Sequence, residues 1–156
     1  MHWNEKIDLV KKKFPATDFK DPYLSGGGIV EKIVVKLFET TMLNFYKSEH
    51  KAKLLKNGIF IKTCTVQQLY KDELLYLNTG KNFWLLLMSV PMGSPLQVYD
   101  CTFEPMRELL YFSSGQLEQE FCIVDKKYSW LFFFKIDNSK NFVEIHKKVN
   151  LGLNAE

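Results

Sequence analysis

The first apolar positions of the chain repeat at helical spacing. They recur four, seven and eleven residues after the first of them, and most of the intervening lysines lie off this stripe. The four positions are Trp3, Ile7, Val10 and Phe14. The spacing predicts a helix that runs to about Lys13 and is stopped by Pro15, because proline lacks a backbone donor and restricts the residue before it.

A second helical stripe follows a break in the pattern. Residues 16–28 show no periodicity and contain Asp21-Pro22 and the run Ser25-Gly26-Gly27-Gly28, so we expect a flexible connection there. The next apolar positions hold the helical repeat for roughly four turns, which predicts one long helix. They are Val30, Ile33, Val34, Leu37, Phe38, Met42 and Phe45.

The middle of the chain changes to a period of two. Gly58 opens a segment, residues 59–64, in which alternate side chains would face opposite ways, and this pattern predicts a strand. The next residues, Thr65-Val-Gln-Gln68, match a capping box, in which a hydroxyl and an amide side chain satisfy free backbone N–H groups. An apolar stripe over 66–77 then predicts a third helix.

Apolar runs and turn signals alternate after this helix. Residues 83–90 form a continuous apolar run, as in a strand covered on both faces, and the turn residues 91–95 join it to a strand at 96–101 as a hairpin. Thr102 can cap a fourth helix, which Ser113-Ser114-Gly115 would end. The inward positions of that helix are Phe103, Met106, Leu109 and Leu110.

Three further strands complete the predicted fold. Residues 120–124 and 130–136 flank a turn as a second hairpin, and residues 142–146 form the last strand. This order predicts an α+β fold: a mainly antiparallel sheet of about five or six strands with about four packed helices and a helical N-terminal half. We expect a single domain over residues 1–156, because domains cluster around ~100–150 residues.

Three successive phenylalanines raise a question about this sheet. Phe132, Phe133 and Phe134 must face alternate sides of their strand, so both faces of the sheet carry aromatic side chains. One aromatic face therefore lacks a helical cover unless the sheet is sandwiched between two layers. The sequence leaves both arrangements open.

Composition excludes several classes of protein. The chain is 46% hydrophobic and 25% charged, unlike a disordered chain. Its three cysteines, Cys64, Cys101 and Cys122, form neither a disulfide framework nor a Cys-x-x-Cys metal motif. Glu5 and Asp8 lie where a signal peptide would be apolar, and no apolar run approaches the ~20 residues that span a bilayer. We expect a soluble cytoplasmic protein with reduced thiols, no membrane association, no metal and no cofactor.

Catalytic signatures are missing from the sequence. It contains neither Gly-x-Ser-x-Gly nor His-Glu-x-x-His, and its three histidines are scattered. This favours a non-catalytic protein. An unrecognised small enzyme remains an alternative, with Asp100, Glu120 and Asp137 as its candidate carboxylates, since acid–base catalysis needs carboxyl groups in unlike environments.

Charge is distributed unevenly along the chain. Residues 1–62 hold 12 lysines and 7 acidic residues, a formal charge of +5, whereas residues 63–156 carry −2. A lysine segment made of Lys47, Lys51, Lys53 and Lys56 gives a second alternative, weak nucleic-acid binding. Arg107 is the one arginine of the chain, and the usual residue for bidentate contacts to guanine or phosphate is arginine. We therefore expect no nucleic-acid partner.

Aromatic residues make up 15% of the chain, with 13 Phe, 7 Tyr and 3 Trp. Most of them are expected to fill the core of a small domain. Aromatic side chains are also enriched in the cores of protein interfaces, so those at strand ends and in turns are candidates for binding a partner. The candidates are Tyr99, Tyr111, Tyr128 and Trp130.

The second predicted hairpin carries a resemblance. The segment Gln119-Glu-Phe-Cys-Ile-Val-Asp-Lys-Lys-Tyr-Ser-Trp-Leu131 resembles a hairpin of small bacterial proteins of unknown function, which show Tyr-x-Ile-Val-x-Lys-Lys-x-x-Trp-Leu. The resemblance covers roughly residues 83–137. In that family the second strand ends in His-His-Asp, whereas here the matching residues are Lys135-Ile136-Asp137, so a site built on those histidines is not carried over.

The order of elements is also similar to that of the Smi/Knr-type superfamily, whose bacterial members include immunity proteins that bind and neutralise toxins. That similarity implies a protein partner, with a toxin domain as its specific form. The net charge of +3 argues against a nuclease as the toxin, because blocking a phosphate-binding surface calls for an acidic inhibitor. We expect a protein-binding module that is a monomer or a weak homodimer.

Overall fold

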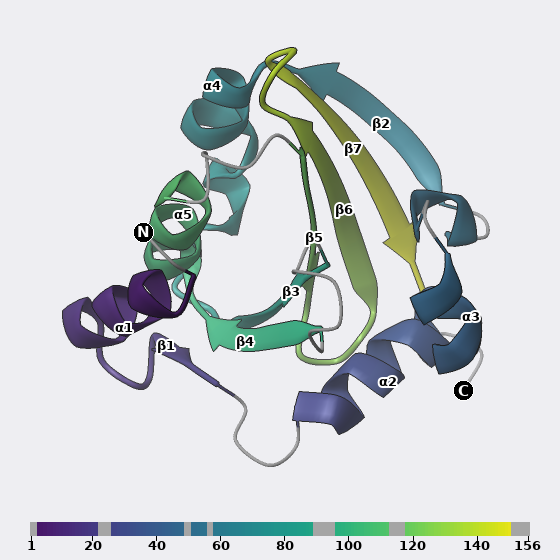
Figure 1. Cartoon of the computed structure of the whole chain (residues 1–156), viewed down its shortest axis with the longest axis horizontal. Coiled ribbons are helices and arrows are strands. Elements are labelled where there is room, and N and C mark those ends of the chain that lie inside the picture. The colour runs from purple at the N-terminus through teal and green to yellow at the C-terminus, as the bar shows by residue number, and fades with distance from the viewer. Residues whose placement is uncertain are drawn as a thin grey trace.

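The computed structural model describes residues 3–21, 26–48, 51–55, 58–88, 96–112 and 118–150 (Figure 1). In chain order the elements are α1 (Trp3–Lys13), β1 (Phe19–Lys20), α2 (Gly26–Lys36), α3 (Met42–Lys47), η2 (Lys51–Leu54), β2 (Ile59–Cys64), α4 (Val66–Gln68), η3 (Leu69–Glu73), η4 (Leu75–Leu77), β3 (Phe83–Leu87), β4 (Gln97–Cys101), α5 (Phe103–Phe112), β5 (Glu118–Val124), β6 (Trp130–Asp137) and β7 (Phe142–Val149).

The described strands form one seven-stranded sheet in the order β1-β4-β3-β5-β6-β7-β2. Every neighbouring pair is antiparallel. The α+β fold class is confirmed, with more strands than the five or six predicted. The addition that the sequence concealed is β1, a two-residue strand inside the predicted connection, where Phe19 pairs with Cys101. A strand of two residues is too short to show a period of two.

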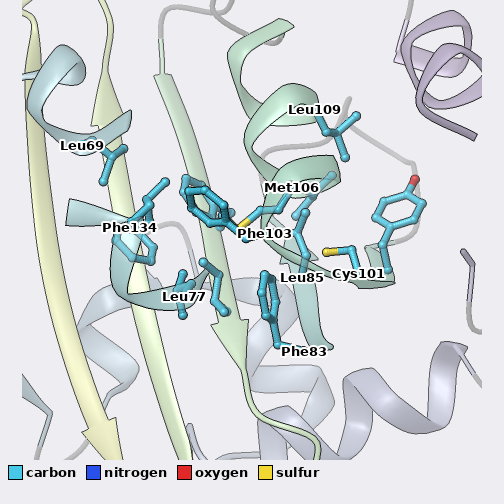
Figure 2. Close-up of a cluster of buried hydrophobic side chains, with 14 of the residues drawn as sticks. Leu69, Leu77, Phe83, Leu85, Cys101, Phe103, Met106, Leu109 and Phe134 are labelled. Atoms are coloured by element: carbon cyan, nitrogen blue, oxygen red, sulfur yellow. The ribbon is translucent and has the colours of Figure 1, made fainter. Parts of the chain in front are cut away.

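Helices lie on both faces of the sheet (Figure 1). We call the face toward α1, α4 and α5 the α5 side, and the face toward α2 and α3 the α2 side. Each side has its own hydrophobic core. Figure 2 shows the core of the α5 side, where Met106 of α5, Leu85 of β3 and Phe134 of β6 point toward one another. The sheet is therefore sandwiched between two layers.

This sandwich accounts for the three successive phenylalanines. Phe133 faces the α2 side, and Phe134 faces the α5 side, where its ring stacks on Phe121 at a centroid distance of 4.8 Å. Both rings are fully buried. Phe132 also faces the α5 side but stays half-buried, so the cover of this face is incomplete near the start of β6.

The prediction of one long helix is wrong, because this segment forms two helices. The helix α2 ends before Glu39, whose φ of 52° lies in the left-handed region, and Thr41 caps α3 by accepting a hydrogen bond from the Asn44 N–H. The apolar stripe continues across this break because both helices pack on the same core. Phe38 and Phe45, one on each side of the break, meet edge to face at 4.9 Å.

The predicted capping box is present at the start of the third helix. The Thr65 side chain accepts from the Gln68 N–H, and the Gln68 side chain accepts from the Thr65 N–H. The helix is less regular than predicted: α4 gives way to the π-helical turn η3 and the 3-10 turn η4. Leu69 and Leu74 are both fully buried and lie five residues apart, a spacing that fits a π turn better than an α turn.

The remaining predicted elements are confirmed within the described residues. The strands β3 and β4 pair as a hairpin, as do β5 and β6. The helix α5 buries Phe103, Met106 and Leu109. The predicted turns at 91–95 and 113–115 lie outside the described residues, as does the side chain of Leu110. No helix among the described residues is both long and apolar enough to span a bilayer.

Candidate functional site

The structure divides the predicted aromatic contact residues. Tyr99 is 3% exposed and stacks on Phe19, and Tyr128 is 9% exposed beneath the ammonium groups of Lys32 and Lys36. Neither tyrosine is available to a partner, because β1 covers the first and α2 covers the second. The side chain of Tyr111 lies outside the described residues, so it stays a prediction.

Trp130 is the predicted aromatic residue that keeps partial exposure. It lies at the start of β6 on the α5 side and lines a pocket of about 640 Å³ together with Phe132, Asn82 and four lysines. The pocket forms where the β5–β6 turn meets the segment before β3. We call it the Trp130 pocket.

The three candidate carboxylates of an enzyme do not share a site. Asp100 pairs with Trp84, and Trp84 pairs with Val124, whereas Glu120 lies four residues before Val124 on β5. At the rise of a strand this places Glu120 about 13 Å along the sheet from the row of Asp100. Asp137 lies further along still, opposite Glu118. Sheet register thus separates the residues that the sequence grouped.

Asp100 and Asp137 also have structural partners. The Lys126 ammonium lies 2.8 Å from an Asp100 carboxylate oxygen. Asp137 accepts hydrogen bonds from the Ser139 hydroxyl and from the Ser139 and Lys140 N–H groups. These bonds, with that of the Ser139 hydroxyl the largest contribution, hold the pKa of the Asp137 carboxyl below its ordinary value. Both carboxylates therefore stabilise local structure.

The predicted lysine segment is only partly available as a basic patch. Lys47 at the end of α3 and Lys53 in η2 are exposed. Lys51 donates to the Ser48 carbonyl at 2.9 Å, and its ammonium lies over the Phe45 ring, so it holds the α3–η2 corner together. Lys56 lies outside the described residues.

The cysteines of the protein lie within or beside the cores. Cys101 and Cys122 are completely buried, and burial raises the pKa of both thiols well above the ordinary value. Cys64 is half-buried, and burial, followed by the nearby Glu73 carboxylate, raises its pKa as well. Raised thiol pKa values oppose thiolate formation and nucleophilic catalysis. Among the described residues, no cluster of His, Cys, Asp or Glu could hold a metal ion.

Among the described residues, the strand β2 presents the longest run of exposed apolar side chains at a sheet edge. Ile59, Phe60 and Ile61 are 66%, 54% and 41% exposed. We call these three residues the β2 edge. The strand pairs with β7 on one side and is the last strand of the sheet on the other, as Figure 1 shows. Its outward backbone N–H and C=O groups therefore face away from the sheet.

The β2 edge offers side chains to both faces of the sheet. Ile59 pairs with Lys147 on the α5 side, and Phe60 pairs with His146 on the α2 side, where the two rings lie 5.3 Å apart. Pairing is irregular between Phe60 and Lys62, which leaves Ile61 as an inserted residue in a bulge. An apolar group is thus available on each side and at the rim of the sheet.

The sequence predicted β2 as a strand but gave no sign of its exposure. Three consecutive apolar residues ordinarily indicate a buried strand. Exposure follows from the position of β2 at the end of the strand order, which depends on pairing with residues about eighty positions later. No composition or periodicity within residues 59–64 carries that information.

No protein-family model matches the chain, and searches of curated proteins and of solved structures return no significant match. The resemblance to the small bacterial proteins and to the Smi/Knr-type superfamily therefore stays a prediction. The candidate sites rest on the geometry of this chain alone.

Proposed function

We propose that the protein is a protein-binding module that holds an extended segment of a partner protein against β2. The observation that carries the proposal is the exposure of Ile59, Phe60 and Ile61 in succession on an edge strand. Partner segments that add a strand to an exposed sheet edge gain affinity from main-chain hydrogen bonds and specificity from alternate side chains.

The apolar side chains make this edge favourable to cover. Complete burial of one large aliphatic or aromatic side chain is worth about 1.5–3 kcal/mol. Three such groups at one edge provide a substantial share of a micromolar interaction, which needs about 8 kcal/mol. Proteins ordinarily protect a sheet edge with charges, proline, a bulge or a covering loop. Here the bulge at Ile61 is present, and the Lys62 ammonium lies 2.5 Å from a Glu73 carboxylate oxygen, but the apolar groups around them stay exposed.

Charge favours an acidic partner segment. Lys53 is exposed in η2, shortly before β2, and Lys147 lies beside Ile59 across the strand pair. Residues 1–62, which include most of β2, carry +5. A second copy of this chain would bring two basic edges together, whereas an acidic segment would be attracted to the edge and held in register. The proposed occupant is therefore an acidic, extended segment with apolar residues at alternate positions, from a different protein.

Toxin neutralisation is the specific form of this function that the similarity of the element order to the Smi/Knr-type superfamily supports. In that form the covered segment belongs to a toxin domain, and binding to β2 blocks the toxin by occupying one of its strands or loops. The basic charge around β2 fits an acidic toxin surface and does not fit a nuclease.

A photoreactive residue at position 60 tests the protein-binding function. Benzoylphenylalanine replaces Phe60 in the full chain, and the matched control replaces Leu43, which is 63% exposed on α3. The partner crosslinked in cells is identified by mass spectrometry, purified, and titrated by calorimetry against the unmodified protein, Phe60→Lys and Leu43→Lys. We expect at least a ten-fold loss of affinity for Phe60→Lys and little change for Leu43→Lys.

Three outcomes would reject the proposal. One is a crosslink from position 60 to a second copy of the chain, accompanied by a concentration-dependent dimer in sedimentation, since the edge would then serve self-association. Another is equal affinity of Phe60→Lys and the unmodified protein for the purified partner. The third is the same crosslinked partner from positions 60 and 43, which would show contact without specificity.

Co-expression tests the toxin-neutralising form. Each protein encoded next to this chain is expressed alone and together with it, and growth is measured. We expect growth inhibition by one neighbour, rescue by the unmodified chain, and loss of rescue with Phe60→Lys but not with Leu43→Lys. If no neighbouring protein inhibits growth, the toxin-neutralising form is rejected. The broader protein-binding function is then decided by the crosslinking experiment.

A further inference from the structure

The Trp130 pocket adjoins the β2 edge through Lys147, which pairs with Ile59, but it has a different chemistry. It lies on the α5 side of the sheet, where the cover is incomplete. Its volume of about 640 Å³ is within the ~300–1,000 Å³ of pockets that bury small ligands. Its walls come from the end of η4, the segment before β3, the β5–β6 turn, and strands β6 and β7.

Aromatic rings form one wall of the pocket. Trp130 meets Phe132 edge to face at a centroid distance of 5.5 Å, and Phe132 stacks on the buried Phe134 at 6.4 Å. Phe83 and Leu77 are buried and close the apolar floor. Because Phe134 belongs to the core of the α5 side, the two partly exposed rings are held in place from below. A flat ring could lie against this wall without rearranging it.

Lysines also line the pocket. Lys81 and Lys127 are exposed, and the Lys147 ammonium lies 5.4 Å from the centre of the Phe132 ring. Within the described ranges, none of these three lysines forms an ion pair with a carboxylate. Lys126 also lines the pocket, but its ammonium is held by Asp100 at 2.8 Å. Three positive charges are thus available to a ligand.

Of the described residues that line the pocket, one is acidic, and its carboxylate is engaged by its own turn. One oxygen of Asp125 accepts from the N–H groups of Ser129 at 2.7 Å and Trp130 at 3.0 Å, and the other accepts from the Ser129 hydroxyl. These bonds orient the carboxylate toward the backbone of the turn. Asp125 therefore shapes the pocket and fixes the start of β6, while the lysines make the charge of the rim positive.

We propose that the Trp130 pocket binds a small organic anion that carries a flat aromatic ring. The ring lies against Trp130 and Phe132, and the carboxylate or phosphate group of the ligand meets Lys81, Lys127 and Lys147. Aromatic stacking and charge attraction act on different parts of the ligand, so a molecule with both parts binds more tightly than either part alone.

Matched probes separate these two contributions. Naphthoate supplies a ring with a carboxylate, naphthalene methanol supplies the ring without charge, and acetate supplies the carboxylate without the ring. Adenosine monophosphate carries a phosphate and a different flat ring, and it tests whether the pocket accepts a nucleotide. Binding is followed through the indole N–H resonance of Trp130, assigned by its loss in Trp130→Phe. Titration of this shift gives the dissociation constant of each probe. We expect the dissociation constant of naphthoate or the nucleotide to be at least ten-fold lower than that of naphthalene methanol or acetate.

Charge removal at the rim gives an independent test. The double variant Lys81→Gln with Lys127→Gln changes two exposed side chains and should fold like the unmodified protein. It should weaken binding of the anionic probe roughly three- to ten-fold, because a partly exposed charge contributes modestly to attraction. The control Lys140→Gln removes an exposed lysine from the β6–β7 turn and should leave binding unchanged. Added salt should weaken the binding of the anionic probe to the unmodified protein and have a smaller effect on its binding to the double variant.

Several results would overturn the pocket proposal. These are equal binding of naphthoate and naphthalene methanol, an unchanged affinity in the double lysine variant, or no saturable shift of the Trp130 resonance with any probe up to about 5 mM. If the protein partner of β2 shifts the Trp130 resonance and no small anion does, the pocket belongs to the protein interface. That result would also reject the pocket proposal. Phe60→Lys should leave naphthoate binding unchanged, so failure of the β2 function and failure of the pocket are distinguishable.

Discussion

The Lys148 ammonium lies 2.7 Å from a carboxylate oxygen of Glu39, and this ion pair joins the last strand to the end of α2. The two side chains differ in exposure: that of Lys148 is 5% exposed, whereas that of Glu39 is 47% exposed. Glu39 also has the left-handed backbone conformation that separates α2 from α3. One acidic residue therefore lies in the break between two helices and pairs with a buried ammonium.

The unequal burial predicts unequal mutant stability. Glu39→Gln removes a negative charge beside a buried ammonium, whereas Lys148→Met removes the ammonium and leaves a carboxylate that water can reach. We expect Glu39→Gln to lower the free energy of unfolding by about 1–3 kcal/mol and Lys148→Met to lower it less. Urea denaturation of both variants measures the difference. Greater destabilisation by Lys148→Met would show that the aliphatic contacts of the lysine outweigh its charge.

The capping box of α4 gives a second prediction. Thr65→Ala removes the hydroxyl that accepts from the Gln68 N–H, and we expect a loss of about 1 kcal/mol in the free energy of unfolding. The control Thr17→Ala makes the same chemical change at an exposed position outside a helix cap. Thermal and urea unfolding should separate the two variants. Equal stability would mean that the Asn141 side chain, which accepts from the Val66 N–H, suffices to start the helix.

Thiol reactivity follows from burial of the cysteines. With a chromogenic disulfide reagent under native conditions, we expect Cys64 to react first and Cys101 and Cys122 to react only as the protein unfolds. Denaturant should expose all three to rapid reaction. Cys64→Ser should abolish the early phase and leave the slow phase unchanged. Rapid reaction of all three thiols in the native protein would contradict the packing of β4 and β5.

The turn after β6 makes stability depend on pH. Hydrogen bonds lower the pKa of Asp137 in the folded state below its ordinary value of 3.8. The ionised carboxylate therefore stabilises the folded state at pH values above the Asp137 pKa of the unfolded chain. This contribution is lost as the pH falls through the lower pKa of the folded state. Asp137→Asn should therefore reduce the melting temperature at about pH 7 and have little effect on it at about pH 2.

Carbon-detected titration of the Asp137 carboxyl measures the shift directly. Asp72→Asn makes the same change on the exposed surface of η3 and serves as the control. An Asp137 pKa at or above 3.8 would contradict the hydrogen bonding of the turn.

Local signals predicted much of the fold. The α1 helix, the two hairpins and the capping box depend on residues within a few positions of one another, and sequence spacing reports such contacts directly. The break at Glu39 could not be predicted in this way. A left-handed residue is usually glycine or asparagine, and a glutamate there depends on tertiary contacts such as the ion pair with Lys148.

The candidate sites were harder to predict because they depend on distant pairings. Tyr99 precedes a polar residue near a strand end, but Phe19, eighty positions earlier, stacks on it and removes it from the surface. Trp130 was recognised as a candidate, whereas the lysines that share its pocket come from three separate segments. Residues 59–64 contain no information about which strand becomes the edge, so the exposure of Phe60 was not predicted.

The pairing of β2 with β7 also constrains the order in which the chain can fold during synthesis. In the described sheet, β7 is the one neighbour of β2, and Ile59 pairs with Lys147. Most of the protein must therefore emerge from the ribosome before β2 can join the sheet. Throughout that interval Ile59, Phe60 and Ile61 belong to an unpaired segment, which a chaperone or a partner made at the same time could bind before the sheet is complete.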